Sequence, residues 1–177
     1  MSDFLELCKE RQSCRSFSDK PVEHEKLMSC IEAARLAPSA CNAQPWSFVV
    51  VEKPELVAEV AKCGMQFGIN EFLENAQAFI IILEEHAKLI RKLRTVLDSQ
   101  YFAKGDIGAA AVSICYQATA LGLGTLMVGM YDRPQLCELL DLPADQRFGA
   151  YIAVGYPENA AVRDKARKPL EEMVKVL

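Results

Sequence analysis

The stretch Ala37-Pro38-Ser39-Ala40-Cys41-Asn42-Ala43-Gln44-Pro45-Trp46 lies between an amphipathic pattern and an apolar run, and it decides how the first half of the chain folds. Pro38 predicts the end of a helix, because proline disfavours the helical conformation of the residue before it. Asn42 and Gln44 then precede the apolar run Phe48–Val51. Their side-chain amides offer uncharged donors and acceptors, which suit a flat heteroaromatic ligand. The alternative is an ordinary polar turn beside the core.

Outward from this stretch, apolar periodicity and helix start and stop signals predict the remaining elements. Expected helices cover 3–12, Glu23–Ala37, Pro54–Met65, Glu84–Leu97, Ile107–Leu121 and Pro134–Leu140, and expected strands cover Trp46–Val51, Ala76–Leu83, Thr125–Val128 and Phe148–Val154, with Gly64–Asn75 irregular. The order lacks strict βαβ regularity, so we predict an α+β fold with a central mixed β-sheet surrounded by helices.

The composition indicates one globular domain covering residues 1–177. Hydrophobic residues make up 51% and charged residues 25% of the chain, which is ordinary for a folded protein. The net charge of −4 argues against nucleic acid as the main partner, because binding to a phosphate backbone needs a basic face. Basic residues that cluster locally therefore need a local reason.

Seven cysteines occur without a CxxC pair, and the chain has only two histidines, so no metal site is expected. An odd number of cysteines without a signal peptide favours reduced thiols and a cytoplasmic location. No apolar run approaches the length of a membrane span, so no membrane association is expected. Cys41, inside the polar loop, is the thiol that we single out as a candidate for reactivity.

Two basic clusters lie near opposite ends of the chain. Arg11 and Arg15 flank Ser13, and a planar guanidinium together with a hydroxyl suits the binding of a phosphate. The alternative is that these cations stabilise the C-terminal end of a helix. The second cluster consists of Arg163, Lys165, Arg167 and Lys168. Charges in a tail also serve solubility, which is the alternative there.

Read in order along the chain, several short motifs resemble the nitroreductase family of FMN-dependent oxidoreductases, from about Phe4 to Val174. No single motif is specific, but their common order is hard to obtain by chance. The motifs are Arg11-Gln12-Ser13-Cys14-Arg15, Gly105-Asp106-Ile107-Gly108-Ala109-Ala110, Leu121-Gly122-Leu123-Gly124-Thr125, Val154-Gly155-Tyr156-Pro157 and Arg167-Lys168-Pro169-Leu170, besides the amide loop.

The resemblance implies an intertwined homodimer with FMN at the interface. The Pro38–Gln44 loop would then come from the other subunit, and the C-terminal tail, about 157–177, would reach toward the partner. The Gly- and Ala-rich helix Ile107–Leu121 is expected to be a central core or dimer helix. The implied FMN-binding residues are Arg11, Gln12, Ser13, Arg15, Pro38, Ser39, Ala40, Asn42, Gln44, Asn70, Met127, Val128, Gly129, Lys165 and Arg167.

The resemblance also implies the chemistry. No catalytic side chain is needed, because the flavin performs the redox step and the backbone of Val128 and Gly129 lies near flavin N5. NADH or NADPH would reduce FMN, and a nitroaromatic, quinone or free flavin would accept the electrons in a ping-pong cycle. Flavin-cannibalising and dehalogenating branches are rivals within the family. Outside it, the alternatives are a flavin carrier or sensor without efficient turnover, and a thiol-based redox protein using Cys41.

Overall fold

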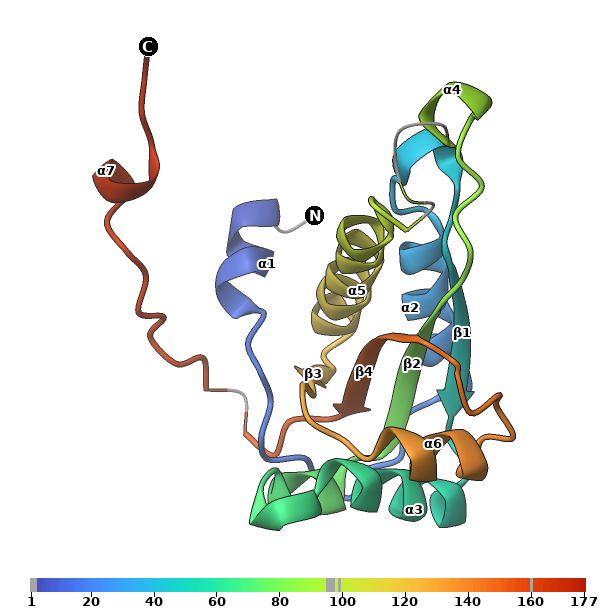
Figure 1. Cartoon of the computed structure of the whole chain (residues 1–177). Coiled ribbons are helices and arrows are strands. Elements are labelled where there is room, and N and C mark those ends of the chain that lie inside the picture. Colours follow the sequence, from blue (N-terminus) through green and yellow to red (C-terminus); the bar gives the residue numbers. More distant parts are fainter. Residues whose placement is uncertain (1–2, 95–97, 99, 160) are drawn as a thin grey trace.

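A four-stranded sheet with helices on both faces forms the body of the protein in this computed structural model, which describes residues 3–94, 98, 100–159 and 161–177 (Figure 1). The strands are β1 (Trp46–Val51), β2 (Ala78–Glu84), β3 (Gly124–Met127) and β4 (Phe148–Gly155). The α-helices are α1 (Phe4–Glu10), α2 (His24–Arg35), α3 (Pro54–Gly64), α4 (Arg91–Arg94), α5 (Ala103–Ala120), α6 (Arg133–Leu139) and α7 (Leu170–Met173). Three short 3-10 helices complete the list, namely η1 (Ala40–Asn42), η2 (Gln66–Gly68) and η3 (Glu71–Asn75).

The strands lie in the order β1-β2-β4-β3, and each neighbouring pair is antiparallel. The α+β class is confirmed, whereas the pairing within the sheet differs from the mixed arrangement expected. A parallel pair needs a crossover along the sheet, but α3, η2 and η3 turn the chain back at one end of it, between β1 and β2 (Figure 1). A parallel pairing occurs only as the isolated bridge between Ser13 and Thr125 among the described residues.

The core has two halves, one on each face of the sheet. Strand β2 is buried along its whole length and alternates between the halves, as a strand must. Phe79 and Ile81 face the half that contains residues of α3 and α6, and Ile80 and Ile82 face the half formed with α2 and α5. Continuous apolar sequence in this strand therefore reflects burial on both sides.

The expected helix Glu84–Leu97 is wrong over its first half. Glu84 ends β2, where its backbone N–H donates to the Arg147 carbonyl at 2.8 Å and its carboxylate pairs with the Arg147 guanidinium at 2.8 Å. The Gln100 amide also donates to this carboxylate, at 2.8 Å. These tertiary partners outweigh the charge spacing that predicted a helix, and only α4 is helical; residues 95–97 lie outside the described residues.

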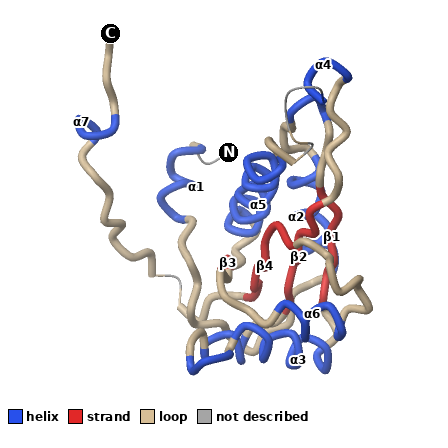
Figure 2. Tube along the Cα trace, viewed as in Figure 1, coloured by secondary structure: helices blue, strands red, loops and turns tan. Residues whose placement is uncertain are grey.

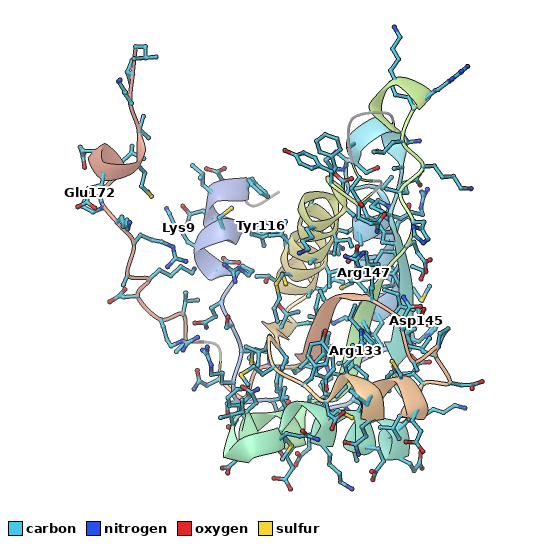
Figure 3. The ribbon with its side chains drawn as sticks, viewed as in Figure 1. Lys9, Tyr116, Arg133, Asp145, Arg147 and Glu172 are labelled. Carbon is cyan, nitrogen blue, oxygen red and sulfur yellow. The ribbon has the colours of Figure 1, made fainter. Side chains whose placement is uncertain are left out.

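Helix α1 packs on α5 through Tyr116. The Phe4 and Tyr116 rings meet edge to face at 5.2 Å, and the Cys8 thiol donates to the Tyr116 hydroxyl at 3.4 Å (Figure 3). The loop after α1 then runs beside β3, as Figure 2 shows. After β4 the tail turns back past α1, forms α7 away from the body and continues beyond it to the C-terminus (Figure 1). No helix among the described residues has the length and apolarity to cross a membrane.

Candidate functional site

Extended backbone after α1 brings the Arg-x-Ser-x-Arg segment, residues 11–15, onto the free edge of β3. The Cys14 N–H donates to the Thr125 carbonyl at 2.9 Å, and Ser13 bridges Thr125. A Cβ atom added to Gly124 would lie 2.7 Å from the Cys14 Cβ atom, so glycine is what allows this close approach. The segment is thereby fixed to the sheet.

Residues on the two sides of this extended segment differ in character, because side chains alternate along it. Cys14 is buried, and burial raises the pKa of its thiol, which donates to the Ser16 carbonyl at 3.2 Å. Arg11, Ser13 and Arg15 line a second surface, which faces the tail. The neutral thiol anchors the segment, and the charged side chains are left for a ligand.

The tail brings the second basic cluster to the same place. The Lys165 ammonium donates to the Cys8 carbonyl at 3.2 Å and to the Lys9 carbonyl, both in the last turn of α1, where a cation is favoured (Figure 3). A cavity of about 310 Å³ results between tail and segment. Its lining residues are Arg11, Gln12, Ser13, Arg15, Arg163, Asp164, Lys165, Ala166 and Arg167. We call this cavity the basic pocket.

The basic pocket contains more positive charge than the protein neutralises. Burial lowers the pKa of Lys165, and the positive charges of Arg11 and Arg167 lower it further. The Nε atom of Arg11 is buried and has no hydrogen-bond partner among the described residues. Asp164 is the one acidic residue of the lining. Five basic residues thus face a single carboxylate in the lining, so the pocket fits an anionic ligand such as a phosphate monoester.

Beyond Arg15, the chain has side chains that could meet the rest of a flavin. The Arg15 guanidinium lies 6.0 Å from the centre of the Phe72 ring, so η3 is next to the segment. Asn70, just before η3, has a left-handed backbone with φ of 59°, a conformation that asparagine tolerates. Its side-chain amide donates to the Gly64 carbonyl at 3.0 Å. The implied residue Asn70 therefore lies two residues before the ring that Arg15 approaches, and its side-chain amide donates a hydrogen bond within the protein.

At the end of β3, the two candidate backbone amides differ. The Val128 N–H already donates to the Tyr151 carbonyl at 2.8 Å, so it is not available to donate to a ligand. Gly129 lines a cavity of about 330 Å³ with Gln66, Met130, Tyr131 and Arg133. A Cβ atom at Gly129 would meet nothing within 4 Å, so a ligand can approach this backbone closely. Met127, just before, is 46% exposed.

The amide loop lies elsewhere. Its Ala40 N–H donates to the Asp106 carboxylate at 3.1 Å and 3.2 Å, near the first turn of α5. Cys41, Asn42 and Gln44 all have positive φ, and Cys41 is exposed. The segment on β3 begins beyond the other end of α5, about 20 Å further at 1.5 Å per residue. Within one chain, Pro38, Ser39, Ala40, Asn42 and Gln44 therefore do not reach the basic pocket.

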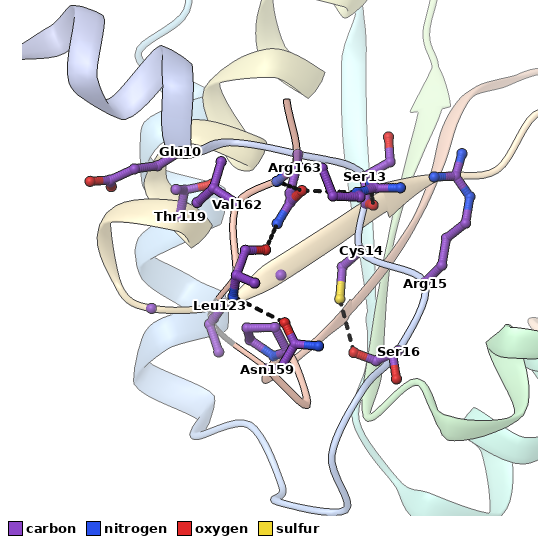
Figure 4. Close-up of a pocket in the computed structure, with 15 residues that line it drawn as sticks. Glu10, Ser13, Cys14, Arg15, Ser16, Thr119, Leu123, Asn159, Val162 and Arg163 are labelled. Atoms are coloured by element: carbon purple, nitrogen blue, oxygen red, sulfur yellow. Dashed lines mark hydrogen bonds between the residues drawn. The ribbon is translucent and has the colours of Figure 1, made fainter. Parts of the chain in front are cut away.

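Sequence reasoning missed two features here. The sequence places Arg163 in the basic tail, but its contacts with Gln12 and Ser13 follow no motif. A larger cavity of about 590 Å³ lies next to the basic pocket and shares Gln12, Ser13, Arg15 and Arg163 with it (Figure 4). Its lining includes Cys14, Leu123 and Val162. Only the path of the tail creates this cavity, so the sequence offered no signal for it.

Comparison with known proteins shows the family of this chain. The family model described as "Nitroreductase family" matches residues 8–66 and 55–156. This chain belongs to the nitroreductase family. It is 44% identical over 199 aligned residues to a protein of Streptococcus pyogenes named for NAD(P)H nitroreductase activity, covering 97% of this chain and 98% of that one.

Solved structures agree as well. A nitroreductase family protein from Streptococcus pneumoniae superimposes with a TM-score of 0.84 at 25% identity, covering 99% of this chain and 100% of that one. A structure from Desulfovibrio desulfuricans, described as a nitroreductase in complex with FMN, gives a TM-score of 0.77 at 26% identity, covering 98% and 96%. The predicted family is thus confirmed.

Proposed function

We propose that this protein is an FMN-dependent oxidoreductase that takes electrons from NADH or NADPH. The observation that carries the proposal is the basic pocket, where two clusters about 150 residues apart in sequence come together, with Arg11 and Ser13 from one and Lys165 and Arg167 from the other. A dianionic phosphate would supply the missing acceptors and offset the repulsion among Arg11, Lys165 and Arg167. The FMN bound to the relative from Desulfovibrio desulfuricans carries such a phosphate.

The residues divide into two groups by the part of FMN that they would hold. Arg11, Ser13, Lys165 and Arg167 would bind the phosphate. Arg15 would lie near the pyrimidine end of the ring with Asn70, and the Gly129 backbone N–H would donate to ring atom N5. When bound, FMN supplies the hydride-accepting centre, and the protein supplies binding, orientation and positive charge.

The amide loop supports a site that two chains share. Asn42 and Gln44 offer donors and acceptors for the ring edges, but they lie about 20 Å away along α5 in their own chain. A homodimer that brings the partner's loop to each basic pocket would complete the site. Exposed apolar side chains of the tail favour a partner surface, with Leu170 65%, Met173 59% and Val176 90% exposed.

We further propose a ping-pong cycle in which NAD(P)H and the acceptor use one face of the site in turn. The acceptors that suit this site are nitroaromatics, quinones and free flavins.

All seven thiols are free, with Cys41 exposed, which supports a reducing compartment such as the cytoplasm. The enzyme would need no thiol for turnover.

The test is the absorbance spectrum of the purified protein, followed by anaerobic addition of NADH or NADPH. We expect a yellow protein that bleaches on reduction and recovers its colour when a quinone or nitroaromatic is added. A yellow protein that does not bleach would instead be a flavin carrier or sensor. Colourless protein that stays colourless after reconstitution with FMN would exclude both readings and leave a thiol-based role for Cys41.

A further inference from the structure

Arg163 forms a compact set of hydrogen bonds with the Arg-x-Ser-x-Arg segment. Its Nη2 donates to the Ser13 carbonyl at 2.6 Å, and its Nε donates to the Gln12 Oε1 atom at 3.1 Å (Figure 4). Its backbone N–H also donates to Gln12 Oε1, at 3.2 Å, and the Gln12 Nε2 atom donates to the Ala161 carbonyl at 2.8 Å. We call these four bonds the tail latch. They use both polar atoms of the Gln12 amide.

The latch fixes the segment from the side opposite to the sheet. Ser13 bridges Thr125 of β3, and its carbonyl accepts from Arg163. A second attachment of the tail lies earlier, where the Glu158 N–H donates to the Ser16 carbonyl at 3.0 Å. Between the two attachments the tail spans the 590 Å³ cavity. The latch is therefore the last tail contact with the segment before Lys165, which itself donates to the Cys8 and Lys9 carbonyls of α1, and the two contacts together set where the tail continues into Arg167.

We propose that Arg163 is a positioning residue that holds the two halves of the basic pocket at the spacing a phosphate needs. This rests on the proposed function, because FMN is the ligand in question. One half of the pocket, Arg11 and Ser13, belongs to the segment, and the other half, Lys165 and Arg167, belongs to the tail. Gln12 and Arg163 also line the basic pocket, but both polar atoms of the Gln12 amide and the Nε and Nη2 atoms of Arg163 are engaged in the latch, so we assign them to positioning the ligands of the phosphate.

Charge explains why a latch is needed. Besides burial, the positive charge of Arg11 in the segment lowers the pKa of Lys165 in the tail, so the two halves of the pocket repel each other before an anion is bound. Hydrogen bonds to a neutral amide and a carbonyl offset this repulsion without adding negative charge to the pocket. A carboxylate in place of Gln12 would hold the tail but would compete with the phosphate.

The experiment compares the affinities of apo-protein for FMN and for riboflavin, which lacks the phosphate. For Arg163→Ala we expect the Kd for FMN to rise about tenfold while the Kd for riboflavin stays unchanged. Gln12→Ala should show the same pattern. The double variant should be no weaker than either single variant, because both changes open the same latch. Lys175→Ala, which removes one charge from the same tail outside both the basic cluster and the latch, is the matched control and should behave as wild type.

Two further results separate positioning from charge and from direct contact. Arg163→Lys keeps the positive charge but not the planar set of donors of the guanidinium, so it should recover only part of the FMN affinity that Arg163→Ala loses. Full recovery by lysine, additive losses in the double variant, or an unchanged Kd in Arg163→Ala would each overturn the latch while the proposed function stands. A wild-type protein that binds neither FMN nor riboflavin would overturn the proposed function, and the latch with it.

Discussion

At the scale of single residues, the Arg11 guanidinium lacks a hydrogen-bond acceptor for one of its nitrogen atoms. Its Nε atom is buried without a partner among the described residues, and it lies beside Lys165 and Arg167. Losing a hydrogen bond to a charged group costs about 1.5 to 3 kcal/mol, so Arg11→Ala should raise the Kd for FMN at least about tenfold. Titration of apo-protein with FMN measures this.

Arg35→Ala is the control, since Arg35 pairs with Glu32 on the surface of α2. Equal affinities of Arg11→Ala and wild type for FMN would mean that Arg11 has only a structural role.

We expect substitution of Arg15 to change the midpoint potential of bound FMN more than the affinity for FMN. It lies against Phe72 and is the cation of the segment closest to η3. A positive charge near the pyrimidine end favours the reduced cofactor, and 30 mV in a two-electron couple corresponds to about 1.4 kcal/mol. Arg15→Gln keeps a donor and should lower the midpoint potential of bound FMN by tens of millivolts, about 30 or more. Spectroelectrochemistry of the loaded variant decides this, and a midpoint equal to wild type would assign the role to another cation.

At the scale of elements, α5 has one face that its own chain leaves uncovered. Gly105, Gly108 and Val112 follow the three- and four-residue spacing of one helix face, and Val112 is 36% exposed. A Cβ atom at Gly105 or Gly108 would meet nothing within 4 Å. Such a face lets a second helix approach closely, in keeping with the expectation that α5 is a dimer helix.

Gly108→Leu tests this face. Within one chain the new side chain has room, so the fold should be kept and helix propensity improved. If α5 packs on the partner, the same side chain overfills the interface and the variant should dissociate at concentrations where wild type is dimeric. Sedimentation velocity measures the species present. Glu138→Leu adds the same side chain to the exposed surface of α6 and should stay dimeric; a dimeric Gly108→Leu protein would place the interface elsewhere.

At the scale of the whole molecule, the basic pocket and the amide loop lie near opposite ends of α5. If each site combines the pocket of one chain with the loop of the other, two defective variants can complement each other. Arg11→Ala damages the pocket, and Asn42→Ala with Gln44→Ala damages the loop. Random mixing should give half heterodimers, each with one intact site, so about one quarter of all sites should recover FMN binding.

Co-expression of the two variants with different tags, followed by purification of the heterodimer, tests this complementation, and about half of the sites in the purified heterodimer should bind FMN. Each variant alone should bind FMN weakly. The control mixes Arg11→Ala with Lys165→Ala, which damage the same pocket and should not complement. Recovery in the control, or none in the test pair, would mean that pocket and loop do not meet across the interface.

The sequence by itself determined the elements whose signals are local. Pro38 and Pro54 set the limits of α2 and α3, apolar runs fixed the four strands, and the ordered motifs identified the family. The residues of both basic clusters could also be predicted, because each cluster lies in one short, continuous motif of the sequence. These features depend on backbone sterics, which proline imposes on its neighbours, and on burial, which the spacing of apolar residues along the chain indicates.

Only the tertiary structure decided the features that depend on contacts distant in sequence. Glu84 lies in a strand because Arg147 and Gln100 satisfy its carboxylate, although its neighbours have helical charge spacing. Val128 gives its N–H to Tyr151, which leaves Gly129 as the candidate donor. Arg163 joins Gln12 across about 150 residues. In each case a hydrogen bond inside the fold outweighs local preference, because an unpaired buried polar group costs more than a propensity contributes.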